Sequence, residues 1–137
     1  MKIRSMAVAS VALLASLPAV AAAQPADVGP QRGSGLEACR PGYLCLYENW
    51  QYNQGASARI LRTNEDIGRL DDMNFNDITS AVYNNTDQVV RIYPHFDYQG
   101  VPVTLMPDEH MSFDGVNGTF NDVASSVQFL GWRTSRS

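Results

Sequence analysis

One eight-residue pattern occurs twice in this chain and constrains its fold more than any other feature. Residues 75–82 (FNDITSAV) and 120–127 (FNDVASSV) align at an offset of 45 residues. An aromatic turn precedes each copy and ends at Gly55 in the first case and at Gly100 in the second, again 45 residues apart. An open solenoid buries its core only with about three or more repeats. The duplication therefore predicts two similar units that close on each other in one domain.

The N-terminal segment has the composition of a secretory signal peptide. Lys2 and Arg4 precede an apolar run over residues 6–20, and small residues that end at Ala23 fit a cleavage site. A membrane anchor is the alternative, but two serines and a proline interrupt the run, which is shorter than the about 20 residues of a span. We therefore expect residues 1–23 to direct secretion and to be removed, leaving a mature chain that does not insert into membranes.

The charge of the remaining chain limits its partners. Removal of the leader takes away the only lysine and one arginine, which leaves eight arginines, 14 carboxylates and a formal charge of −6. Nucleic acid requires a basic surface, so we expect no nucleic-acid partner. The 114 residues that remain suit one compact domain, which we expect to be a monomer.

Cys39 and Cys45 are the only cysteines, and they enclose a short turn (RPGYL). An exported chain meets an oxidising environment, so a disulfide is favoured over a metal or redox role. A loop this small stabilises by only about 2 kcal/mol in the chain-entropy model. We expect the disulfide to hold the N-terminal edge of the domain, while the core supplies most of the stability.

Short apolar runs separated by turn residues predict an all-β fold. None of the runs has a helical period, so we expect an antiparallel sandwich of about eight strands with Greek-key connections. Residues 24–36 are polar and rich in Gly and Pro, and we expect a flexible leader there, a domain at 37–133 and a tail at 134–137. The expected strands are 43–47, 56–61, a short one near 68–70, 80–84, 88–93, 101–105, 111–113 and 125–130.

The two units resemble the Greek-key motifs of βγ-crystallins. Each has an aromatic corner, written Tyr93-x-x-x-x-Tyr98-x-Gly100 in the second unit, and then the N/D-N/D-x-x-S/T-S calcium motif of that superfamily. The units span about residues 43–85 and 88–131. With its leader and the cysteine segment, the chain further resembles bacterial proteins of peptidase inhibitor family I36, named after an inhibitor of thermolysin-like metalloproteases. The resemblance implies a βγ-crystallin-like sandwich, no enzymatic activity, and a secreted metalloprotease as partner.

The resemblance also implies calcium sites shared between the units. In the superfamily each motif reaches over the aromatic corner of the other, so oxygens of both units surround one ion. Few of these ligands are ionised, and we expect weak binding, with Kd on the order of 10⁻⁵ to 10⁻³ M. By motif position the ligands are Asp77, Ile78 (carbonyl) and Ser80 of one unit, Asp122, Val123 (carbonyl) and Ser125 of the other, and the carbonyls of Glu48 and Pro94.

The sequence departs from the family pattern in three places. The first motif ends in Ala81 instead of Ser, and its corner is one residue longer, so we expect a looser first site and a stronger site built around Asp122 and Ser125. The chain also lacks the second disulfide that braces the protease-binding loop of the founding inhibitor. We expect the inhibitory loop at residues 106–117 or in the turn 93–100.

Alternatives to these assignments remain at this stage. Asn-Asp-x-x-Ser segments also cap loops through their own side chains. The same fold would suit a non-inhibitory, calcium-stabilised extracellular or envelope protein. His95 and His110 match no hydrolase motif, so we expect no enzyme. Aromatic residues such as Trp50 form either a recognition surface or the packing of their own turns. Asn84 and Asn117 begin glycosylation sequons.

Overall fold

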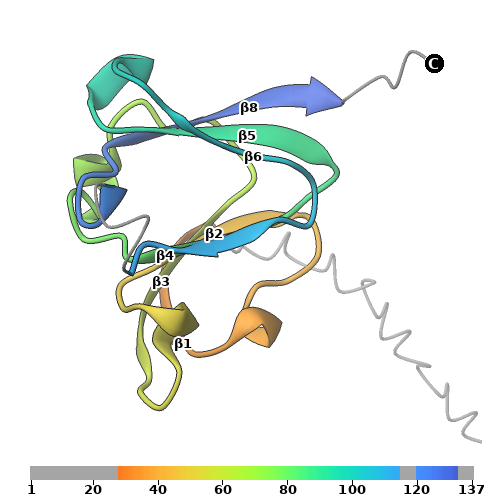
Figure 1. Ribbon diagram of the computed structural model, residues 1–137, viewed down its shortest axis with the longest axis vertical. Helices are drawn as coiled ribbons and strands as arrows, with labels where there is room; N and C mark the ends of the chain where they lie inside the picture. Colours follow the sequence, from red (N-terminus) through yellow and green to blue (C-terminus); the bar gives the residue numbers. More distant parts are fainter. Residues whose placement is uncertain (1–27, 115–119, 133–137) are drawn as a thin grey trace, which may run out of the picture.

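The computed structural model describes residues 28–114 and 120–132, which form two antiparallel β-sheets packed against each other (Figure 1). The larger sheet has the strand order β1-β3-β2-β4-β7 and the smaller one β6-β5-β8. Among the described residues the only helical segments are short 3₁₀ turns, so the all-β prediction is confirmed. The strands are β1 (Gly29–Gly33), β2 (Tyr43–Tyr47), β3 (Ala58–Thr63), β4 (Ala81–Asn85), β5 (Gln88–Tyr93), β6 (Val103–Leu105), β7 (His110–Ser112) and β8 (Ser126–Trp132).

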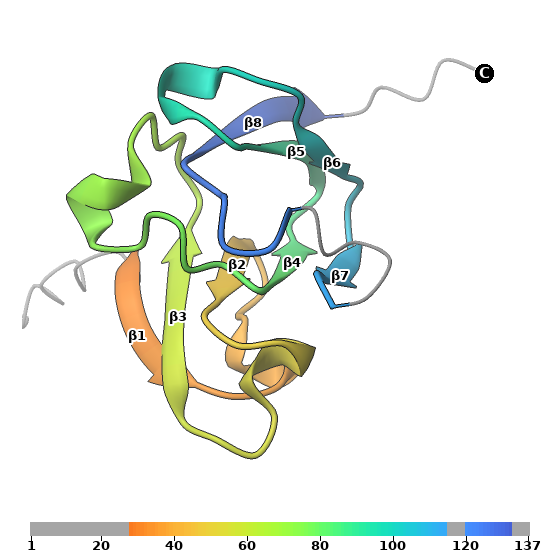
Figure 2. The same cartoon turned by 60° about the vertical axis from the view of Figure 1, so that its left-hand side comes forward.

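Each unit gives one segment to the sheet of the other. Strand β7 of the second unit pairs with β4 of the first, with Val82 opposite Met111 (Figure 2). In return, Ile67 of the first unit exchanges two backbone hydrogen bonds of 2.9 Å with Val127 in β8. This exchange is the Greek-key connection that the sequence predicts, and it closes the two units on each other.

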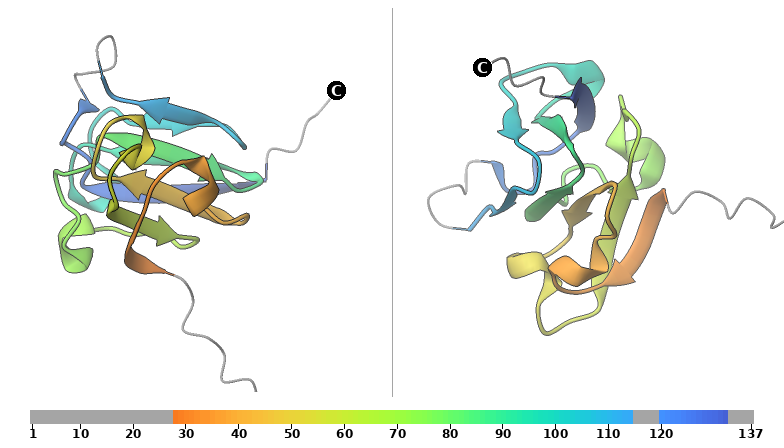
Figure 3. Two further views of the ribbon diagram at one scale, coloured as in Figure 1. Left: turned by 90° about the horizontal axis from the view of Figure 1, so that it is seen from below. Right: turned by 90° about the vertical axis from the view of Figure 1, so that its right-hand side faces the viewer.

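Two parts of the strand assignment differ from expectation. Residues 29–33, which we expect to lie in a flexible leader, form β1 along the edge of β3 (Figure 3). The backbone ladder and a hydrogen bond of 3.0 Å from Arg32 Nη1 to the Ser57 carbonyl hold this strand, so it needs no apolar period. The region near 68–70 is not a strand, because Leu70–Met73 form the 3₁₀ turn η3. The folded domain therefore begins before residue 37.

The core lies between the two sheets and draws on both units. Phe75 and Phe113 are fully buried, and the Phe120 ring lies 5.4 Å from that of Phe113. Phe75 and Phe120 are equivalent residues of the repeat, so both copies anchor in the same core. Neither unit buries its apolar face without the other. The remaining core residues are Leu44, Leu46, Leu61, Ile67, Leu70, Val82, Val90, Ile92, Leu105, Ala124 and Val127.

The predicted disulfide between Cys39 and Cys45 is present. It belongs to a second buried cluster with Tyr47, Ile60 and Ala81, on the face of the larger sheet that is turned away from the main core. The bond links the segment after the 3₁₀ turn η1 (Leu36–Ala38) to β2. It holds the N-terminal edge of the domain, as expected from its short loop.

Asn84 is a buried polar link from β4 to the smaller sheet. Its side chain is fully buried, and its Oδ1 accepts a hydrogen bond of 2.6 Å from Thr86 Oγ1. The first glycosylation sequon is therefore buried, and Asn84 Nδ2, the atom that would carry a glycan, is engaged in hydrogen bonds. The second sequon, at residue 117, lies outside the described residues. The Asn84 amide nitrogen donates to the carbonyls of Gln88 (2.8 Å), Leu105 (3.2 Å) and Met106 (3.0 Å).

The described part of the chain has no helix long and apolar enough to cross a membrane. The expected signal peptide at 1–23 and the tail at 134–137 lie outside that part.

Candidate cation sites between the two units

The two Asn-Asp segments are hydrogen-bonded to each other. Asp77 and Asp122 have left-handed backbone conformations, with φ of 54° and 56°, which Asp and Asn adopt more readily than most residues. Asp77 N donates to Ala124 O at 3.1 Å, and Asp122 N donates to Thr79 O at 3.0 Å. The segments thus contact each other where the two units meet, and their aspartates occupy equivalent positions.

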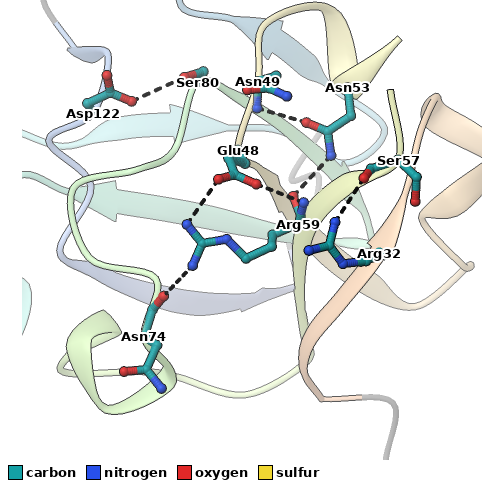
Figure 4. A network of polar contacts seen from close by, with 9 residues as sticks. All are labelled: Arg32, Glu48, Asn49, Asn53, Ser57, Arg59, Asn74, Ser80 and Asp122. Carbon is teal, nitrogen blue, oxygen red and sulfur yellow. Dashed lines mark hydrogen bonds and ion pairs between the residues drawn. The ribbon is translucent and has the colours of Figure 1, made fainter. Parts of the chain in front are cut away.

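The aspartate of each repeat pairs with the serine of the other. Ser80 Oγ donates to Asp122 Oδ1 at 3.1 Å, and Ser125 Oγ donates to Asp77 Oδ1 at 3.3 Å. Figure 4 shows the Asp122 and Ser80 side chains pointing toward one another. Both serines are buried and both aspartates are exposed. The expectation that Asp122 and Ser125 form one strong site is therefore wrong in its pairing, because these residues contact different partners.

The aromatic corners complete each pair with backbone oxygens. Ser80 N donates to Tyr47 O and Ser125 N donates to Tyr93 O, each at 2.8 Å. The residue after each tyrosine is thereby held close to the serine. The predicted ligands thus form two sets. Asp77, Ser125, Val123 and Pro94 line one cavity, which Asp122 also borders, and Asp122, Ser80, Ile78 and Glu48 are their equivalents in the repeat.

The Glu48 side chain is turned to Arg59 on β3 (Figure 4). Glu48 Oε1 lies 3.0 Å from Arg59 Nη2, and Oε2 accepts a hydrogen bond of 2.9 Å from Arg59 N. The hydrogen bond from the guanidinium holds the pKa of the Glu48 carboxyl below its ordinary value. The Glu48 carboxylate is therefore held by Arg59 on β3, and the backbone carbonyl is the Glu48 group that remains to coordinate an ion.

The oxygens of each set fit a weakly held calcium ion. Carboxylate, hydroxyl and carbonyl oxygens are the ligands that calcium takes in proteins. Among the described residues, each set contains one carboxylate without an arginine partner, and no three His, Cys, Asp or Glu side chains form a metal cluster. Asn76 Oδ1, on a residue that lines the cavity of the Asp77 set, is buried without a hydrogen-bond partner. An unpartnered acceptor beside a carboxylate favours a cation at this site over an anion.

The two sets differ in their surroundings. Asn121 Nδ2 donates to Asp122 Oδ2 at 2.9 Å, and Asn121 Oδ1 accepts a hydrogen bond of 2.9 Å from Trp50 Nε1. Trp50 is 54% exposed, and its counterpart in the second corner, Phe96, carries no donor. Both oxygens of Asp122 are thus engaged, whereas Asp77 Oδ2 has no partner among the described residues. The Asp77 set is therefore the more accessible of the two.

The last serine of the second motif, Ser126, holds the second corner in place. Ser126 Oγ donates to His95 O at 2.6 Å and thereby fastens the second corner. Ala81 occupies this position in the first motif, where Asn53 Oδ1 instead accepts a hydrogen bond of 2.8 Å from Asn49 N. Asn53 lies in a run of three residues, 51–53, with left-handed backbone in the lengthened corner. The longer corner therefore compensates for the missing serine.

The two histidines take part in the packing of turns. His110 Nδ1 hydrogen-bonds the Tyr52 hydroxyl at 2.7 Å, and its ring lies edge-on to Tyr52 and Tyr83. His95 contributes its carbonyl to the second corner. These contacts agree with a packing role for the aromatic corner residues.

The two candidate inhibitory loops differ in order. Within residues 106–117, positions 110–112 are strand β7 and 115–117 lie outside the described residues. The turn 93–100 is fastened at its centre, where Asp97 N donates to Gly68 O at 2.8 Å. Val101 follows this turn directly and is 85% exposed. Among the described residues of the two candidates, the turn 93–100 is the one that leads directly from a fixed backbone to an exposed apolar side chain.

Comparison with known proteins identifies the family and the fold. The sequence model of peptidase inhibitor family I36 matches residues 34–105, more than half of the chain. A solved structure from work on the evolution of the eye lens βγ-crystallin domain fold is 16% identical, with a TM-score of 0.62 over 76% of this chain and 99% of that chain. A βγ-crystallin from Ciona intestinalis is 22% identical, with a TM-score of 0.55 over 64% of this chain and 99% of that one. A βγ-crystallin domain from Clostridium beijerinckii is 19% identical, with a TM-score of 0.50 over 64% and 95%. No curated protein matches the sequence.

Proposed function

We propose that this chain, which belongs to peptidase inhibitor family I36, inhibits secreted metalloproteases. The proposed inhibitor is exported and binds calcium weakly. It is a βγ-crystallin protein of the peptidase-inhibitor type and not an enzyme. The proposal of metalloprotease inhibition rests on one observation, the fixed and exposed corner of the second unit.

The corner is suited to enter a protease cleft because little ordering remains on binding. Ser126 Oγ donates to His95 O at 2.6 Å and accepts from Tyr98 N at 3.0 Å, so one buried hydroxyl holds the turn at two points. Val101 places an apolar side chain at the end of this turn, 85% exposed. A binding loop that is already ordered loses less conformational entropy on association, which favours tight inhibition.

The calcium proposal is supported by the crosswise pairing of the two repeats. Each site would take its carboxylate from one unit and its hydroxyl from the other, so an ion would join the two units. Bound calcium would supply positive charge to a carboxylate whose surroundings are otherwise oxygen-rich. An ion that binds only the folded state stabilises it by about 2.7 kcal/mol at a hundred times its Kd.

The test of inhibition is an assay of a thermolysin-like metalloprotease at stoichiometric amounts of this protein. We expect inhibition with the protein left intact, and loss of inhibition in Val101→Asp. Leu130→Asp is the matched control and should still inhibit. Leu130 is also an exposed hydrophobic residue, but it lies on β8, away from the turn. Full protease activity in the presence of intact protein would remove the inhibitor proposal.

A second candidate function is a calcium-stabilised extracellular or envelope protein without inhibitory activity. The observation in its favour is that the only disulfide, Cys39–Cys45, lies at the edge of the first unit and braces neither candidate loop. A melting temperature that rises with calcium, together with no effect on metalloproteases, would favour this function.

A further inference from the structure

The cavity beside the Asp77 set is larger than a metal ion requires. Its volume is about 660 Å³. A calcium ion lies only about 2.3 to 2.6 Å from its oxygen ligands, so an ion bound to Asp77 would leave most of this volume empty. The walls away from the oxygens are apolar and include Phe96, Val101 and Phe120. These three side chains have no oxygen atom that could coordinate a calcium ion. A ligand that fills the cavity therefore has an apolar or planar body in addition to a positive charge.

We infer that this cavity binds the side chain of an arginine that projects from a partner protein. The guanidinium would lie against the free oxygen of Asp77, and the aliphatic stem would lie along the apolar walls at the mouth. A planar guanidinium pairs with carboxylates through two hydrogen bonds and stacks on aromatic rings, which a compact ammonium does less well.

The charge of the chain favours this occupant. Asp77 and Asp122 both line the cavity, and both are exposed. The chain carries 14 acidic against 10 basic residues, and two of the basic residues, Lys2 and Arg4, lie in the expected signal peptide. A basic side chain is therefore attracted both by the nearest carboxylates and by the molecule as a whole.

The Phe96 ring already stacks on a guanidinium within the molecule. The Arg69 guanidinium lies 4.1 Å from the centroid of the Phe96 ring and also pairs with Asp71 at 2.9 Å. Arg69 is not among the residues that line the cavity. An incoming arginine would repeat this combination of aromatic ring and carboxylate, with Asp77 in the place of Asp71.

The test uses Nα-acetyl-arginine amide as the probe, added to the purified protein in calcium-free buffer and followed by ¹H–¹⁵N NMR. The neutral isostere Nα-acetyl-citrulline amide is the control ligand. We expect saturable shifts of the His95, Phe96 and Val101 amides, with a Kd in the millimolar range for so small a probe. Because calcium is absent, the result does not depend on the calcium proposal.

Variants separate this site from general attraction to an acidic surface. Asp77→Asn should weaken binding about fivefold, the upper value for an exposed ion pair. Asn also tolerates the left-handed backbone at this position, so the variant should fold. Asp87→Asn, which removes the same charge from another exposed position, should leave the Kd unchanged. Equal binding of the citrulline probe, equal affinity of Asp77→Asn, or shifts that do not saturate would each overturn the inference.

Discussion

The crosswise pairing of aspartate and serine can be tested by the effect of one serine in two backgrounds. Ser125 contacts Asp77 at 3.3 Å, whereas Asp122 contacts Ser80 at 3.1 Å. If calcium binds as proposed, Ser125→Ala should have no further effect on calcium-linked stability once Asp77→Asn has removed its site. The same substitution should weaken the remaining site in an Asp122→Asn background.

The expected magnitudes follow from two sites, one built around the Asp77 carboxylate and the other around the Asp122 carboxylate. At a hundred times the Kd, each site contributes about 2.7 kcal/mol, so the unmodified protein gains about 5.4 kcal/mol. Asp77→Asn and Asp122→Asn should each leave about 2.7 kcal/mol. Adding Ser125→Ala to Asp77→Asn should leave this value unchanged. Adding it to Asp122→Asn should lower it to about 1.4 kcal/mol, if loss of the hydroxyl weakens the site about tenfold.

The assay is thermal unfolding of the five proteins in calcium and in chelator. For a domain of this size, about 1 kcal/mol corresponds to roughly 4 °C. We therefore expect rises in Tm with calcium of about 20 °C for the unmodified protein, about 10 °C for three variants and about 5 °C for Asp122→Asn/Ser125→Ala. The melts in chelator are the control, because they report any effect of the substitutions on folding itself.

Two results would refute the reasoning in different ways. A loss caused by Ser125→Ala in the Asp77→Asn background, but not in the Asp122→Asn background, would mean that calcium is bound within each repeat. Identical melts in calcium and chelator for the unmodified protein would remove the calcium proposal and leave the hydrogen-bonded pairs as loop caps.

Three further predictions concern single residues. Asn84→Ala should destabilise the protein by about 3 to 5 kcal/mol in urea unfolding, because it leaves several buried carbonyls without their donor; a loss below about 1 kcal/mol would contradict this. Glu48→Gln should cost up to about 1 kcal/mol near neutral pH, since Arg59 loses its charged partner. Arg59 lowers the pKa of Glu48 in the folded state, so this difference should disappear as the pH falls through that lowered pKa, and a difference that persists in acid would exclude the ion pair as its cause. The fluorescence change of Trp50 on calcium addition should disappear in Asn121→Ala, which cuts its link to the Asp122 set.

The closed two-unit fold was predictable because it depends on patterns that are local and repeated. Strands β2 (Tyr43–Tyr47) and β5 (Gln88–Tyr93) have the predicted limits, since both are apolar runs bounded by turn residues. Strand β1 was not predictable in this way. Its residues, GPQRG, pair with β3 through the backbone at a sheet edge, and edge pairing requires no apolar side chains.

The candidate sites show which part of such a prediction fails. The repeat identifies Asp77 and Asp122 as equivalent, but an alignment of two copies cannot say whether a ligand of one copy belongs with its own serine or with that of the other. That choice depends on how the units close, and it is decided where Asp77 N and Asp122 N donate to the opposite repeat. The alignment also does not reveal what compensates for the serine that is missing at Ala81. Asn53, which lies elsewhere in the chain, fastens the first corner in its place. A departure from a motif therefore predicts a weaker site only after the neighbouring turns have been searched for a substitute donor or acceptor.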